Sequence, residues 1–179
     1  YYTSDPTAGV IYSYGATSLA SGVFVDQPGA VFHGLDAAGG DLYALRSGSK
    51  DLVKYDLPSN TPVVLATGLK RPNDVAVDIA RDRIYVTDSG LDFLQIYTLS
   101  GTLLSSINFT GAWGVDVDET DGTVFISRYE SVEVWRKKGN EPNFALLTTG
   151  LDGPRGLEVD RDGNGYVLEA NAKRVVTLS

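Results

Sequence analysis

Residues 113–118, Trp-Gly-Val-Asp-Val-Asp, decide the fold together with the turn residues Asp121-Gly122 and a second apolar run around Phe125. Apolar and polar side chains alternate in the first run, which is typical of a β-strand that buries one face. Asp and Gly readily adopt the backbone conformations of a tight hairpin. The stretch therefore predicts two antiparallel strands joined by a short turn.

The same pattern recurs along the chain at a nearly constant spacing. Further copies begin at His33 (His-Gly-Leu-Asp), Asn73 (Asn-Asp-Val-Ala-Val-Asp) and Arg155 (Arg-Gly-Leu-Glu-Val-Asp), so the four copies start 40, 40 and 42 residues apart. An aromatic residue leads each second strand, and two more apolar strands follow it. These aromatic residues are Tyr2, Tyr43, Tyr85, Phe125 and Tyr166. Four antiparallel strands in a repeat of about 41 residues predict the blades of a β-propeller.

We expect an all-β fold of 18 strands in a single domain, residues 1–179, with almost no helix, because no window has a helical period. The strands make about four and a half four-stranded antiparallel blades, beginning at a second strand and ending at a third. The approximate units are residues 1–30 (partial), 31–69, 70–111, 112–152 and 153–179 (partial). Because blades bury both faces, this count predicts either a longer chain or a ring that another copy completes. Val75, Val115 and Leu157 should be buried on innermost strands.

Two stretches resemble known propeller repeats. Residues 153–160, with 163–167 and the pair Arg174-Val175, resemble an NHL repeat, and residues 84–89 (Ile-Tyr-Val-Thr-Asp-Ser) resemble the related YWTD motif. The resemblance covers essentially the whole chain, and it implies that the blades belong to a six-bladed ring. Together with a glycosylation sequon at Asn108, it also implies an extracellular or periplasmic location.

Composition argues against several classes of function. The chain has 15 Lys and Arg against 23 Asp and Glu, a net charge of −8, which disfavours nucleic acid as a partner. No apolar run approaches the roughly 20 residues of a membrane helix. With no cysteine and one histidine, thiolate zinc sites, Cys–His catalysis and three-histidine zinc sites are impossible. We expect no cofactor and no metal site.

One position in the repeat varies strongly from blade to blade. The residues that enter the first strands are His33, Asn73, Trp113 and Arg155. In propellers of this family, the loops that enter first strands and leave second strands lie on one face, around the axis. The variety suggests a ligand-binding mouth with an aromatic wall, a cation and two hydrogen-bonding groups. The alternative is that exposed entry positions vary freely.

A second position, at the exit of each second strand, carries charges of alternating sign. These residues are Asp5, Arg46, Asp88, Arg128 and Glu169. We expect a charged ring of ion pairs that joins neighbouring blades, because alternation cancels the net field that would attract an ion. The alternative is a polar rim for a charged ligand.

The resulting prediction is a non-catalytic binding or structural module that engages a protein, small-molecule or glycan ligand at its axial face. Whether the chain is an enzyme stays open. Residues 71–74 (Arg-Pro-Asn-Asp) resemble a stretch of the SMP-30/gluconolactonase family, six-bladed metal-dependent lactonases, which implies that Asn73 would line an active site. In that family Glu, Asn and Asp at entry positions hold the ion. Trp113 and Arg155 cannot ligate a hard cation, so this alternative lacks part of its metal site.

Overall fold

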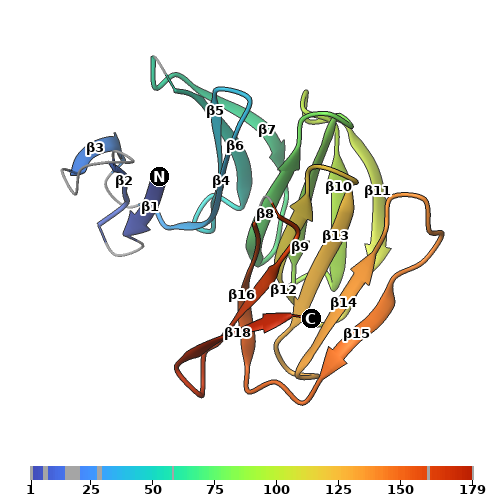
Figure 1. Ribbon diagram of the computed structural model, residues 1–179. Coiled ribbons are helices and arrows are strands. Elements are labelled where there is room, and N and C mark those ends of the chain that lie inside the picture. The colour runs from blue at the N-terminus through green and yellow to red at the C-terminus, as the bar shows by residue number, and fades with distance from the viewer. Residues whose placement is uncertain are drawn as a thin grey trace.

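The computed structural model describes residues 2–5, 8–14, 21–27, 30–57, 59–160 and 162–178. In these residues the chain forms 18 antiparallel strands and no helix, arranged as five small sheets (Figure 1). The described part contains no helix that is long and apolar enough to cross a membrane. The all-β propeller fold predicted from the repeat is therefore confirmed. Closure of a ring by six blades stays a prediction.

We number the sheets blade 1 to blade 5 in chain order. Blade 1 contains β1 (Tyr2–Asp5), β2 (Val10–Tyr14) and β3 (Ser21–Asp26). Blade 2 contains β4 (Phe32–Ala38), β5 (Asp41–Arg46), β6 (Asp51–Asp56) and β7 (Pro62–Thr67). Blade 3 contains β8 (Pro72–Asp78), β9 (Arg83–Asp88), β10 (Phe93–Tyr97) and β11 (Leu103–Asn108). Blade 4 contains β12 (Ala112–Asp118), β13 (Thr123–Arg128), β14 (Glu133–Lys137) and β15 (Ala145–Thr149), and blade 5 contains β16 (Pro154–Val159), β17 (Gly165–Glu169) and β18 (Arg174–Leu178).

The first strand of each four-stranded blade is the innermost one. Strand β4 packs against β8, β8 against β12, and β12 against β16, so these strands surround a common axis while the fourth strands lie outside. Within the described residues, blade 1 contains no such first strand and blade 5 contains no fourth strand. In the described residues, no extensive contact joins blade 1 to blade 5.

Hydrophobic packing between neighbouring blades forms the core. Val75, Val115 and Leu157 on the innermost strands are 3%, 2% and 6% exposed, which confirms their predicted burial. Leu45 of blade 2 packs in one cluster with Val75 and Val86 of blade 3. Because burial of apolar area is the main favourable term in folding, the interfaces between blades hold the molecule together.

Glycines on the innermost strands permit this close packing. A Cβ atom on Gly114 of β12 would overlap the backbone oxygen of Arg155 in blade 5, and one on Gly34 would overlap Asp74 of blade 3. At the equivalent Gly156 of blade 5, a Cβ atom would meet only the side chain of Leu168 at 3.7 Å, an ordinary contact. The same repeat position is therefore sterically closed in blades 2 and 4 and open in blade 5.

We expect Gly114→Ala to destabilise the 179-residue chain by about 2–4 kcal/mol, because the added methyl group must push two innermost strands apart. Gly156→Ala makes the same chemical change at the equivalent position and should alter stability by less than about 1 kcal/mol. Urea unfolding followed by circular dichroism measures both. Equal effects of the two substitutions would contradict the blade packing described here.

Candidate functional site

The entry and exit positions lie at the same end of each blade. Ala112, just before Trp113, pairs with Arg128 in the ladder between β12 and β13. Pro154, just before Arg155, pairs with Glu169 in the ladder between β16 and β17. The first strand therefore starts beside the end of the second, as expected from the resemblance to known propellers.

The structure brings two of the four entry residues together. The guanidinium carbon of Arg155 lies 4.8 Å from the ring centroid of Trp113 and 4.7 Å from that of Tyr129. The two rings are 5.5 Å apart and inclined at 46°. Both distances to the cation are within the range of a cation–π interaction. We call Trp113, Tyr129 and Arg155 the axial cluster.

Hydroxyl groups on the second strands fix the backbone of this cluster. Thr87 accepts the N–H of Asp74 (3.1 Å) in its own blade and donates to the carbonyl of Trp113 (2.5 Å) in the next. Ser127 likewise accepts the N–H of Gly114 (2.9 Å) and donates to the carbonyl of Arg155 (2.8 Å). Thr87 and Ser127 are buried, so these hydrogen bonds are shielded from water.

The sequence did not single out Tyr129 or its neighbour Asn171. The Tyr129 hydroxyl donates to Asn171 Oδ1 (3.4 Å), and Asn171 Nδ2 donates to Asp152 Oδ1 (3.1 Å), so the ring is held from blade 5. Tyr129 directly follows the exit residue Arg128. In the sequence, the position after the exit residue is Pro6, Ser47, Ser89, Tyr129 and Ala170, so the tyrosine stands out as the only aromatic residue there.

The other two entry residues are not part of the cluster. Asn73 is 8% exposed, and its Nδ2 donates to the carbonyl of Ala112 (3.0 Å), so it joins blade 3 to blade 4. His33 is exposed on β4 of blade 2, while Trp113 and Arg155 belong to blades 4 and 5. Among the described residues, no group of three or more His, Cys, Asp or Glu side chains could hold a metal ion.

Two acidic exit residues, Asp88 and Glu169, bind the chain segment that leads into their own blade. Asp88 is fully buried and accepts the backbone N–H groups of Lys70 (2.7 Å) and Arg71 (2.8 Å), just before β8. Glu169 accepts the N–H of Asp152 (2.7 Å), just before β16. The two carboxylates therefore accept backbone N–H groups in the connections between blades, where no neighbouring strand offers an acceptor.

Arginines at the same position bind oxygen atoms instead. Arg128 Nε donates to the carbonyl of Thr110 (2.8 Å), before β12. Arg46 Nη1 donates to Oε1 of Gln27 (3.4 Å), before β4. At these four exit residues, the sign of the charge thus matches the hydrogen-bonding group that the connection offers.

The sequence suggested ion pairs between blades, but in the described residues the ion pairs of Arg46, Arg128 and Glu169 lie within one blade. They are Arg46 with Asp51 (2.6 Å), Arg128 with Glu133 (2.8 Å) and Glu169 with Arg174. In each pair the partner opens the third strand of the same sheet and lies opposite the exit residue in the ladder. The hairpin between second and third strands therefore determines the pairing. Asp5 accepts the N–H of Ala8 (3.1 Å) in the turn after β1.

Carboxylates on the innermost strands join consecutive blades. Asp36 accepts the N–H of Val77 (2.7 Å), Asp74 that of Val115 (3.2 Å), and Asp116 that of Val159 (2.6 Å). Every acceptor lies in one blade and every donor in the next. These acids belong to the repeat, but their contacts between blades could not be predicted from the sequence.

Burial shifts the titration of these three acids strongly. Loss of hydration raises the pKa of Asp36 to about 6, that of Asp74 to about 7 and that of Asp116 to about 8, although the donated N–H bonds act in the opposite direction. Burial also raises the pKa of Glu158. Asp36, Asp116 and Glu158 line an axial cavity of about 620 Å³.

Comparison with known proteins supports the fold. No protein-family model matches the chain, and no curated protein matches it. A chain in the crystal structure of a nidogen/laminin complex is 19% identical with a TM-score of 0.79, over 97% of this chain and 76% of that one. Virginiamycin B lyase from Staphylococcus aureus is 11% identical with a TM-score of 0.78, and its catalytically inactive variant with quinupristin is 10% identical with a TM-score of 0.75. Each alignment covers 99% of this chain but 62% of the lyase, less than two thirds.

Blades 4 and 5 suggest a direct test of the exit residues, because the Arg128–Glu133 pair has the opposite polarity to the Glu169–Arg174 pair. Arg128→Glu should destabilise the chain by about 1–3 kcal/mol, since it loses two hydrogen bonds and places two carboxylates together. Adding Glu133→Arg recreates the polarity of blade 5 and should recover at least about 1 kcal/mol, measured as the coupling energy of a double-mutant cycle.

The exposed Lys138→Glu serves as the control for that cycle and should change stability by no more than about 0.5 kcal/mol. Strictly additive effects of the two substitutions at positions 128 and 133 would rule out the pairing.

The raised pKa values predict that stability falls as pH rises. An exposed aspartate titrates near 3.8, so between about pH 4 and pH 8 the folded state holds more protons than the unfolded state. The stabilisation from protonation is complete below about pH 4 and is lost as pH rises through 6, 7 and 8. The chain should be more stable at pH 5 than at pH 8, by on the order of a few kcal/mol.

Urea unfolding across this range measures the slope. Asp116→Asn mimics the protonated carboxyl group and should reduce the slope, whereas Asp162→Asn, on the exposed turn after β16, should not. A pH profile that is flat or rising between pH 5 and pH 8 would contradict the prediction.

Proposed function

We propose that the chain is a non-catalytic binding module that engages an acidic segment of a protein partner at the axial cluster. The observation that carries the proposal is the state of Arg155. Its guanidinium group lies on two aromatic rings at an exposed position and forms no ion pair with any described residue.

The guanidinium group of Arg155 is therefore preorganised to bind a carboxylate. The rings of Trp113 and Tyr129 restrict the guanidinium, so less conformational entropy is lost when it binds. A planar guanidinium binds a carboxylate through two parallel hydrogen bonds. Trp, Tyr and Arg are also the residues that most often dominate binding energy at protein interfaces. The structural similarity to a chain of the nidogen/laminin complex is compatible with protein binding but extends to the fold alone.

The lactonase alternative receives less support. The side-chain amide of Asn73 is already engaged by the carbonyl of Ala112, inside the interface between blades 3 and 4. Trp113 and Arg155 stack on each other, so two of the entry positions serve an aromatic–cation cluster. The extracellular or periplasmic location remains part of the proposal, supported by the exposed Asn108 of the glycosylation sequon.

Selection of peptides displayed on phage tests the proposal while the natural partner is unidentified. Peptides selected on the native chain, without counter-selection on any variant, should be enriched in Asp or Glu. Synthetic copies should bind Arg155→Gln about tenfold more weakly or worse, a loss of about 1.4 kcal/mol. Lys138→Gln removes one exposed positive charge elsewhere and should leave the affinity unchanged. Selected peptides that bind native chain and Arg155→Gln equally would overturn the proposal.

A further inference from the structure

A second cavity lies between blades 3 and 4, away from the axis. Its volume is about 370 Å³, and its walls include Ile107 and Phe109 at the end of blade 3 and Trp135 and Phe144 of blade 4. Phe109 packs edge-to-face on Phe144, with ring centroids 5.2 Å apart, and on Trp135, at 6.0 Å. The cavity thus contains a preformed aromatic wall.

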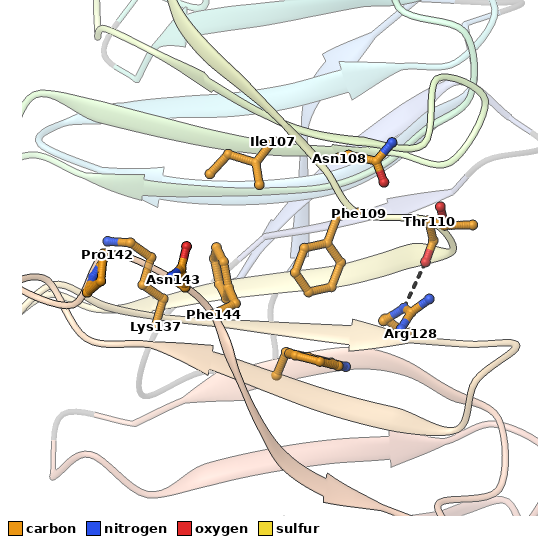
Figure 2. Close-up of a pocket in the computed structure, with 10 residues that line it drawn as sticks. Ile107, Asn108, Phe109, Thr110, Arg128, Lys137, Pro142, Asn143 and Phe144 are labelled. Carbon is orange, nitrogen blue, oxygen red and sulfur yellow. Dashed lines mark hydrogen bonds between the residues drawn. The ribbon is translucent and has the colours of Figure 1, made fainter.

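Two cations lie beside this wall. Figure 2 shows Lys137 and Arg128 on opposite sides of the adjacent rings of Phe144 and Phe109. Arg128 is already occupied, because it pairs with Glu133 and donates to the carbonyl of Thr110. Lys137 forms no ion pair within the described residues.

A neighbouring cavity of about 340 Å³ extends the site. Lys137, Phe144 and Ile107 line both cavities, and the second one adds Arg81 and Arg83. Arg81 pairs with Asp78, whereas Arg83 has no ion-pair partner among the described residues. Among the residues that the structure describes, no carboxylate side chain lines either cavity, although the chain has a net charge of −8. We call the two cavities together the interblade groove.

We propose that the interblade groove binds a small amphipathic anion, a flat apolar ring that bears a carboxylate. The ring packs against Phe109 and Phe144 in the first cavity, and the carboxylate binds the Lys137 ammonium group at the junction with the second. Aromatic rings pair favourably in offset or edge-to-face contact, and an unpaired ammonium group at the edge of an apolar cavity gains strongly from an anion. This site is separate from the axial cluster and does not depend on it.

The two tryptophans allow a direct test by NMR. Trp135 belongs to the groove and Trp113 to the axial cluster, and they are the only tryptophans in the chain. Trp135 Nε1 donates to Glu133 (2.8 Å), so its indole N–H has a defined environment. In the ¹⁵N-labelled chain, Trp113→Phe assigns the two indole signals. Millimolar 2-naphthoate should then shift the Trp135 signal in a saturable manner and leave the Trp113 signal in place.

Matched probes and variants identify the contacts. The uncharged 2-naphthamide should bind at least about fivefold more weakly than 2-naphthoate, and Lys137→Gln should weaken 2-naphthoate by a similar factor, because each removes the charge-assisted contact. Lys138→Gln, the adjacent exposed lysine, should change the affinity less than about twofold. Absence of a saturable Trp135 shift would overturn the proposal. Equal weakening by Lys137→Gln and Lys138→Gln would overturn it as well.

Discussion

The close approach of neighbouring first strands around the axis determines the rest of this structure. Gly114 of β12 leaves room for the backbone of β16 in blade 5, and the carboxylate of Asp116 accepts the N–H group of Val159 in β16. Because the first strands of blades 4 and 5 lie so close together, the Ser127 hydroxyl can also donate a hydrogen bond to the carbonyl of Arg155. The axial cluster is a consequence, since Trp113 and Arg155 can stack only because their strands start side by side.

Much of the fold could be predicted from the sequence. Alternation with a period of two identified the strands, and the constant spacing of the motif that begins at Trp113 assigned each strand to a position in a blade. This periodicity predicted both the 18 strands that the described residues form and the burial of Val115. The sequence also singled out Trp113 and Arg155 as candidates, because a variable residue inside a constant framework stands out, and their side chains lie in contact.

The sequence did not predict contacts that depend on the local geometry of a hairpin or loop, because the position of a residue in the repeat does not determine them. The alternating exit charges suggested pairing around the ring, but the nearest partner of Arg128 is Glu133, five residues along the chain and directly opposite in the hairpin. The interblade groove was missed for another reason. Its wall combines Phe109, at the end of blade 3, with Phe144, in the loop before β15, and these segments are the least regular parts of the repeat.

The three carboxylates on the innermost strands, Asp36, Asp74 and Asp116, all accept hydrogen bonds from residues later in the chain, and this affects the order in which the bonds can form. Each carboxylate reaches forward to the following blade: Asp36 is 41 residues before Val77, Asp74 is 41 before Val115, and Asp116 is 43 before Val159. On a ribosome, a newly made blade therefore keeps its axial carboxylates hydrated until the next blade has been synthesised. Each of these hydrogen bonds can therefore form only after the following blade has been synthesised.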